Sequence, residues 1–262
     1  MISELAQVHP EAKLAENVSV EAFAVIEKDV VIGEGTRVAS HAIICDGARV
    51  GKNCTIHPGA VVSGEPQDLK FEGEITTTEI GDNTVIREYA TISRGTKDKL
   101  KTVIGSNVLI MAYVHVAHDC VVGDNCILAN SVQVAGHCTI EDWAIIGGTT
   151  AIHQFCSVGK HAMVAGGALL GKDVPPFALT TRTPCGFSSV NTIGLRRRGY
   201  SNEQIRNIQE IYKGLFQEGK NVTQGIEWIE NNIKESKEKR DILNFISNSA
   251  RGVIRPVKEE LS

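Results

Sequence analysis

The 262-residue chain lacks the features that mark several large protein classes. Aromatic residues make up only 5% of it, and no apolar run approaches the length of a membrane-spanning helix. A formal net charge of -4 argues against a general nucleic-acid binder, because a phosphate backbone demands a basic face. The first residues show no basic stretch followed by an apolar segment. We therefore expect a cytoplasmic protein with no transmembrane segment and no nucleic-acid partner.

Several catalytic signatures are also missing. No GxSxG elbow, P-loop or GxGxxG fingerprint occurs in the required context, which disfavours serine hydrolases, phosphotransferases and dinucleotide enzymes. The seven cysteines include no CxxC pair, so neither a disulfide framework nor a zinc ribbon is favoured. Any catalytic chemistry has to come from another arrangement of side chains.

The dominant feature that is present is an aliphatic residue at every sixth position from Val8 to Leu170. Of the 28 positions in this frame, 25 are Ile, Val or Leu. The three exceptions are acidic and fall in two stretches, near residues 63–79 and 93–103, which we interpret as projecting loops. A six-residue period is neither helical nor a simple strand alternation, and it indicates the hexapeptide repeat of a parallel β-helix.

A second class of mostly small residues lies four positions after the frame residues. Five cysteines belong to it: Cys54, Cys120, Cys126, Cys138 and Cys156. Free cysteine packs as a small hydrophobe, so we interpret these thiols as wall material and not as nucleophiles. Glycines such as Gly33 and Gly105 often follow the frame residue directly, and we expect their backbone freedom to serve tight turns.

The repeat ends near residue 173, and the composition changes by about residue 186. Beyond that point, Ser201 and Gln204 can form a capping box at the start of an amphipathic helix. Two further amphipathic helices are predicted after it. We expect a mainly β protein, with a β-helix over residues 1–185 and a C-terminal α-helical domain over 186–262. This domain caps the β-helix, docks a partner, or does both.

With this repeat, the chain resembles the hexapeptide acyltransferases. The resemblance implies that three hexads make one coil and that three chains assemble into a homotrimer. It also implies a left-handed β-helix, a handedness that comes from the resemblance alone because parallel crossovers are usually right-handed. Roughly nine coils, stacked at about 4.8 Å each, would form a prism about 40 Å long.

Four histidines and one aspartate stand outside both inward-facing classes, so a role in the core explains them poorly. They are His115, His118, Asp119, His137 and His153. Because one coil takes three hexads, His118 and His137 lie on adjacent coils. We expect the five side chains to gather in one outer region, and unrelated surface histidines are the alternative.

Such a cluster suits general base catalysis. A neutral imidazole can deprotonate a hydroxyl near neutral pH, and a neighbouring carboxylate can fix its tautomer. His118 and Asp119 could work in this way without a protein nucleophile if the substrate supplies the hydroxyl, which fits direct acyl transfer. The alternatives are a structural β-helix and a zinc enzyme that resembles the γ-class carbonic anhydrases. The histidine spacing does not match the zinc pattern, and we expect no metal and no cofactor.

Longer runs narrow the resemblance to the UDP-N-acetylglucosamine O-acyltransferases of lipid A biosynthesis, and it covers essentially the whole chain. The runs that carry it include Gln67–Phe71, Ile92–Thr96, Val116–Cys120, Ala135–His137, His153–Cys156, Asp173–Phe177 and Leu195–Gly199. The resemblance implies transfer of a 3-hydroxyacyl group from acyl carrier protein to the 3-hydroxyl of UDP-N-acetylglucosamine, the first step of lipid A biosynthesis. An N-acyltransferase of the same pathway is the nearest alternative.

The resemblance also implies roles for individual residues. His118 would be the general base, Asp119 its partner, and the backbone amide of Gly136 an oxyanion donor. The residues that would bind the substrate are Asp68, Lys70, His115, His137, His153, Gln154, Asn191, Arg197 and Arg198. Met163 and Gly166 would lie at the end of the acyl-chain groove.

One residue departs from the family pattern. Ile193 stands where the family has an acidic residue, which puts a uracil or ribose contact in doubt at this position. Acyl carrier proteins present an acidic helix, so a basic docking surface is expected. The candidates for this surface are Lys172, Arg196, Arg197 and Arg198.

Overall fold

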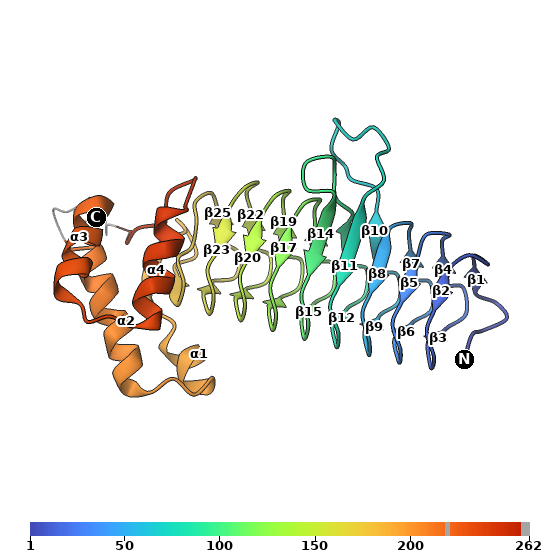
Figure 1. Cartoon of the computed structure of the whole chain (residues 1–262), viewed down its shortest axis with the longest axis horizontal. Helices are drawn as coiled ribbons and strands as arrows, with labels where there is room; N and C mark the ends of the chain where they lie inside the picture. The colour runs from blue at the N-terminus through green and yellow to red at the C-terminus, as the bar shows by residue number, and fades with distance from the viewer. Residues whose placement is uncertain (218–220, 258–262) are drawn as a thin grey trace.

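The computed structural model describes residues 1–217 and 221–257. Short strands wind into a long prism with a cluster of helices at its C-terminal end (Figure 1). Successive strands join three different sheets in turn, so three strands make one coil. In most coils a strand pairs in parallel with the strand three hexads further along, so that Leu109, for example, lies opposite Ile127. The predicted parallel β-helix is confirmed.

The strands fall into three sheets. The first sheet contains β1 (Gln7–Val8), β4 (Val25–Ile26), β7 (Ile43–Ile44), β10 (Val61–Gly64), β13 (Thr91–Ser93), β16 (His115–Val116), β19 (Gln133–Val134), β22 (Ala151–Ile152) and β25 (Leu169–Leu170). The second contains β2 (Lys13–Leu14), β5 (Val31–Ile32), β8 (Ala48–Val50), β11 (Thr77–Ile80), β14 (Lys101–Ile104), β17 (Val121–Val122), β20 (Thr139–Ile140) and β23 (Ser157–Val158). The third contains β3 (Ser19–Val20), β6 (Arg37–Val38), β9 (Thr55–Ile56), β12 (Val85–Ile86), β15 (Leu109–Ile110), β18 (Ile127–Leu128), β21 (Ile145–Ile146), β24 (Met163–Val164), β26 (Ala178–Thr180) and β27 (Phe187–Val190).

The interior of the prism consists of the two residue classes seen in the sequence. Frame residues such as Ile110 and Val116 are fully buried, and the small residues four positions later are buried beside them. All five cysteines of the small class are free and buried. Burial raises the pKa of Cys126 to about 12, which keeps it a neutral thiol. The interpretation of these cysteines as wall material is therefore supported.

The turns use two devices. The residue three positions after the frame residue usually has a positive φ, as for Asp119 at 59° and His137 at 62°. The glycines that follow the frame residue, such as Gly33 and Gly105, do not have a positive φ. A Cβ on Gly33 would lie 2.6 Å from the carbonyl carbon of Gly51 in the next coil. The predicted role of these glycines in turn flexibility is wrong, because close stacking of the coils requires them.

Two segments project from the prism beside each other (Figure 1). One joins β10 to β11 across residues 65–76, and the other joins β13 to β14 across residues 94–100. Both lie within the stretches where the aliphatic frame fails. These segments fall inside the stretches near 63–79 and 93–103 that the sequence predicts as projecting loops, while the ends of those stretches belong to strands. Both segments leave the same side of the molecule (Figure 1).

Within the described residues, four helices cover the C-terminal end of the prism: α1 (Thr192–Arg197), α2 (Asn202–Leu215), α3 (Val222–Asn232) and α4 (Lys237–Ser247). Their apolar residues form a cluster with Phe177 and Val190 of the β part. The predicted capping box of Ser201 and Gln204 starts α2. The sequence did not indicate α1, because six residues are too few to show an amphipathic period. No helix in the described part of the chain combines the length and the hydrophobicity needed to cross a membrane.

The predicted division after residue 185 falls between β26 and β27, which pair in an antiparallel manner at the end of the third sheet. The helices begin at Thr192. Of the predicted second domain, residues 218–220 and 258–262 lie outside the described part of the chain.

Candidate active site

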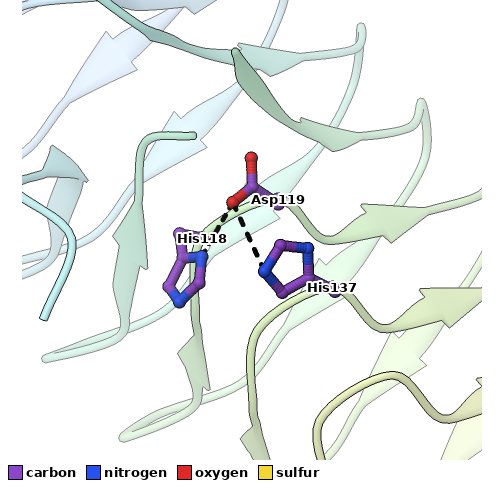
Figure 2. Close-up of side chains that lie close together, drawn as sticks. All are labelled: His118, Asp119 and His137. Atoms are coloured by element: carbon purple, nitrogen blue, oxygen red, sulfur yellow. Dashed lines mark hydrogen bonds and ion pairs between the residues drawn. The ribbon is translucent and has the colours of Figure 1, made fainter. Parts of the chain in front are cut away.

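Two adjacent turns at one edge of the prism bring together His118, Asp119 and His137 (Figure 2). His118 and Asp119 follow β16, and His137 follows β19 one coil later, so all three lie between the first and second sheets. The rings of His118 and His137 meet edge to face, with their centroids 5.0 Å apart. The left-handed turn conformation of Asp119 and His137 is one that Asp and His adopt more readily than most residues.

Asp119 is completely buried and is held by the 94–100 loop. Its Oδ1 accepts hydrogen bonds from the backbone N–H of Thr96 at 3.0 Å and of Lys99 at 3.2 Å. Its Oδ2 accepts from the hydroxyl of Thr96 at 2.6 Å and from Nδ1 of His118 at 2.8 Å. Burial alone would raise the pKa of Asp119, but these hydrogen bonds outweigh it and lower the pKa below its ordinary value. Asp119 is therefore a carboxylate at neutral pH.

His118 has one ring nitrogen engaged and the other available. Because the Asp119 carboxylate can only accept, Nδ1 of His118 carries the proton. Nε2 then holds the lone pair, and it lies 4.0 Å from Oδ2 of Asp68 in the 65–76 loop. A Cβ on Gly136 would come within 2.7 Å of this ring, so only glycine leaves room for His118 in this position.

His137 is placed between two carboxylates. Its Nδ1 lies 3.1 Å from Oδ2 of Asp98, although without hydrogen-bond geometry, and its Nε2 lies 3.8 Å from Oδ2 of Asp119. Its ring stacks on Phe155 from the next coil at a centroid distance of 4.7 Å. The Asp119 carboxylate is thus closer to His118 than to His137.

His115 belongs to a different local arrangement. It points outward from β16, and its Nδ1 shares a 2.7 Å hydrogen bond with the hydroxyl of Thr91. Burial, and then the nearby His118, lower the pKa of His115. A neutral His115 is therefore favoured near pH 7.

Two cavities flank His118 and His137. The first, of about 390 Å³, lies along the first sheet and is lined by His115, His118, Gly136 and apolar residues that include Ile152. The second, of about 270 Å³, is lined by Asp68, Lys70, Asp98, His137 and Gln154. The edge of the prism thus separates a largely apolar hollow from one lined mainly by polar and charged residues.

Some predicted site residues lie further away. His153 is exposed on the same edge, and its Nδ1 contacts the carbonyl of Gln154. Met163 lies on β24 of the third sheet, and Gly166 is exposed in the turn that follows it. A Cβ on Gly166 would lie 3.1 Å from the carbonyl oxygen of Gly148, so the coils stack closely there as well.

Asn191 and Arg198 lie at a different edge of the prism. Both contact His161, which sits in the turn between the second and third sheets. Asn191 donates to the carbonyl of His161 at 3.0 Å and caps α1 through the N–H of Gly194. Arg198 lies over the ring of Trp143 and 3.4 Å from Nδ1 of His161. Four more residues that the sequence analysis singled out for nucleotide binding or carrier-protein docking are exposed: Lys172, Ile193, Arg196 and Arg197.

The half-buried His161 makes the stability of the folded protein depend on pH. Burial, reinforced by Arg198 and nearby lysines, lowers the pKa of His161 from 6.5 to about 4. The unfolded chain takes up the proton near pH 6.5, so the folded state loses stability as the pH falls from 6.5 toward 4. After discounting for the solvent that reaches this half-buried ring, the loss is at most about 2 kcal/mol.

We expect His161→Asn to remove this dependence. Asparagine occupies the equivalent left-handed turn position in other coils, as at Asn107 and Asn125, so the backbone should accept it. Urea unfolding at one protein concentration should show that the free energy of unfolding falls less between pH 7.5 and pH 4.5 in the variant than in the wild type. A stability difference that stays constant across this range would contradict the assigned neutral histidine.

The residues that hold Asp119 were not predicted from the sequence. Thr96 and Lys99 lie in a loop whose existence was predicted, but nothing in its composition marked these donors. The aliphatic frame carries no information where it is interrupted, so the contacts become visible only in the folded chain.

Comparison with known proteins identifies relatives over most of the chain. Residues 173–254 match the family described as UDP N-acetylglucosamine O-acyltransferase, domain 2, and residues 11–46, 29–64 and 101–136 match the bacterial transferase hexapeptide family. An acyl-[acyl-carrier-protein]--UDP-N-acetylglucosamine O-acyltransferase of Thermodesulfovibrio yellowstonii is 39% identical over 97% of this chain and 99% of its own length. The protein of that name from Chlorobaculum parvum is 55% identical over 79% of this chain and 78% of its own.

Solved structures agree with these sequence matches. A UDP-N-acetylglucosamine acyltransferase from Bacteroides fragilis superimposes with a TM-score of 0.96 at 48% identity, covering 97% of this chain and all of its own. The corresponding enzyme from Francisella novicida gives a TM-score of 0.95 at 42% identity, covering 98% of this chain and 94% of its own. The similarity therefore includes both the β-helix and the helical cap.

Proposed function

Because the chain belongs to the UDP-N-acetylglucosamine O-acyltransferase family, we propose that it transfers a 3-hydroxyacyl group from acyl carrier protein to the 3-hydroxyl of UDP-N-acetylglucosamine. This is the reaction that opens lipid A biosynthesis. The observation that carries the proposal is the pairing of His118 with the buried Asp119 carboxylate, which leaves Nε2 of His118 available as a base. We place this activity in the cytoplasm.

The proposed reaction is a direct displacement at a thioester. The sugar hydroxyl attacks the acyl carbonyl carbon and gives its proton to Nε2 of His118, while Asp119 stabilises the imidazolium through Nδ1. The carbonyl oxygen becomes an oxyanion, which the amide of Gly136 stabilises. Collapse of this intermediate breaks the carbon–sulfur bond, and His118 returns the proton to the leaving thiolate. No protein nucleophile takes part, in agreement with the raised pKa of buried cysteines such as Cys126.

The cavities fit the two parts of the substrate. The polar cavity beside Asp68, Lys70 and Gln154 suits a sugar, and the apolar hollow along the first sheet suits the start of an acyl chain. In this proposal His137 and His153 border the sugar site and His115 borders the acyl site. Met163 and Gly166 lie at the far end of the acyl groove.

His118, Asp119 and His137 are close enough to share a cation. The zinc alternative would need three histidines, His115, His118 and His137. Among the described residues, the group close enough to share a cation contains Asp119 and not His115, whose Nδ1 is hydrogen-bonded to Thr91. The hydrogen bond between His118 and Asp119 favours a base and its partner.

An acyl-transfer assay tests the proposal. The purified protein is incubated with UDP-N-acetylglucosamine and 3-hydroxyacyl carrier proteins of several chain lengths, and the ester product is measured. The result also establishes the preferred acyl length. Acylation only of the corresponding amino sugar would instead identify the N-acyltransferase, and no product with either acceptor would refute the proposal.

A homotrimer is part of the same proposal. Within one chain, His118 lies at the edge between the first and second sheets, whereas Asn191 and Arg198 lie at the edge between the second and third. We propose that a neighbouring chain brings its Asn191, Arg197 and Arg198 to the nucleotide bound near His118. The guanidinium groups then bind the phosphates, and the exposed Arg196 and Lys172 help to dock acyl carrier protein.

This arrangement predicts complementation between inactive variants. If His118→Ala chains are mixed with Arg197→Ala/Arg198→Ala chains and reassembled, some sites receive His118 from one chain and both arginines from its neighbour. Random mixing at equal amounts should restore about a quarter of the wild-type activity, because each site in a cyclic trimer takes one component from each of two chains.

The matched control mixes His118→Ala with a chain that carries all three substitutions, and it should restore nothing. Activity in the first mixture that does not exceed the sum of the separate variants would show that each site is built within one chain.

A further inference from the structure

Each carboxylate oxygen of Asp119 accepts two hydrogen bonds, but from different kinds of donor. Oδ1 accepts two backbone N–H groups, from Thr96 and Lys99. Oδ2 accepts the hydroxyl of Thr96 and Nδ1 of His118, so both of its lone pairs are in use. The third candidate donor, Nε2 of His137, lies 3.8 Å from the same Oδ2, beyond hydrogen-bond distance.

The direction of the Thr96 hydroxyl is fixed by its surroundings. Its oxygen lies 3.4 Å from the backbone N–H of Asp98, which can only donate, so the hydroxyl hydrogen points to Asp119. The Thr96 side chain and the Asp119 carboxylate are both buried, which strengthens this bond. One lone pair of Oδ2 is thereby taken before either histidine competes for the other.

We propose that Thr96 is the positioning residue that selects which histidine is paired with Asp119. By occupying one site on Oδ2, its hydroxyl leaves a single acceptor position, which points at Nδ1 of His118. His137 is thereby left with Asp98 and Phe155 as its close neighbours. The inference rests on the proposed function in one respect, that His118 is the base.

The geometry also explains why the 94–100 loop contributes to the site although the loop itself does not carry the base. Thr96 and Lys99 reach Asp119 from outside the repeat, and Nζ of Lys99 also donates to the Asp119 backbone carbonyl at 3.1 Å. The loop therefore fixes both the side chain and the backbone of the turn. Of these contacts, the hydrogen bond from the Thr96 hydroxyl can be removed by a substitution that keeps the shape of the side chain.

Thr96→Val tests the proposal because valine keeps the shape and removes the hydroxyl. We expect kcat to fall about tenfold, since a hydrogen bond to a charged group is lost. Thr96 also lines the cavity proposed for the sugar, so KM for UDP-N-acetylglucosamine is measured as well, and the loss in kcat should exceed the change in KM. Thr96→Ser should restore most of the activity. In an Asp119→Ala background, Thr96→Val should change kcat less than twofold, because the two residues act through one another.

Thr102→Val is the matched control. Thr102 is likewise a buried threonine near this loop, but its hydroxyl has no hydrogen-bond partner among the described residues. Its replacement should leave kcat and KM unchanged. An equal loss of kcat in both variants, or a full effect of Thr96→Val in the Asp119→Ala background, would overturn the proposal.

A spectroscopic measurement separates this inference from the proposed reaction. In protein with ¹⁵N-labelled histidine, the Nδ1–H proton of His118 should give a low-field resonance that is absent in His118→Ala. We expect this resonance to shift or broaden in Thr96→Val, return in Thr96→Ser and persist in Thr102→Val. An unchanged resonance in Thr96→Val would refute the positioning role, whether or not the protein transfers acyl groups.

Discussion

Replacing His118 with alanine is expected to reduce turnover by about 10²–10⁴-fold, the usual contribution of a positioned general base. The variant keeps Asp119 and the loop that holds it, because Thr96 and Lys99 still donate to the carboxylate. The substrate hydroxyl then has no group to receive its proton. Steady-state kinetics with saturating acyl carrier protein should show the loss in kcat.

His57→Ala is the matched control for this substitution. His57 is also a partly buried histidine beside a carboxylate, with Nδ1 3.2 Å from Oε1 of Glu88, but it lies in an earlier coil. Its loss should leave turnover within a factor of about two, as expected of a change that contacts no reacting atom. Near-normal activity of a folded His118→Ala protein would exclude His118 as the base.

Gly105→Ala is expected to destabilise the β-helix by about 3 kcal/mol, at the upper end of the cost of overpacking. An added Cβ would lie 2.5 Å from Oδ1 of Asp124, 2.7 Å from the carbonyl carbon of Gly123 and 2.8 Å from the backbone nitrogen of Asp124. The Asp124 side chain can turn away, but the two backbone atoms cannot, so the two coils have to separate. Urea unfolding at a fixed protein concentration should show the decrease.

Gly171→Ala provides the contrast. A Cβ at Gly171 would meet no atom within 4 Å among the described residues, and the residue does not have a positive φ. The free energy of unfolding of the Gly171→Ala variant should stay within about 0.5 kcal/mol of the wild-type value. Equal effects of the two substitutions would show that backbone conformation, and not the spacing of the coils, accounts for these glycines.

The wall of the β-helix could be predicted because each coil repeats the same constraint. Val116 must face inward, which places His115 on the outer surface and His118 in the turn. The three-hexad length of a coil then brings His137 beside His118, as the structure confirms. The repeat therefore predicted the fold, and the repeat together with the coil length implied by the family resemblance predicted the histidine pair.

Interactions that cross the repeat were not predictable in this way. Thr96 reaches Asp119 from a loop of irregular sequence, and the position of such a loop depends on its own folding. Asn191 was predicted to reach the nucleotide, but within one chain its side chain caps a helix and contacts His161. The sequence assigned no residue to a particular edge of the prism, so the separation of Asn191 from His118 could not be foreseen.

The stacking glycines also limit how the protein can change its size. Since Gly33 must face Gly51 and Gly105 must face Gly123, an insertion or deletion within the wall keeps these contacts only if it adds or removes a whole coil. The distance between the His118 turn and the helical cap is thus adjustable only in steps of about 4.8 Å, the spacing of neighbouring strands. Smaller changes in length have to be absorbed by loops such as residues 65–76, outside the stack.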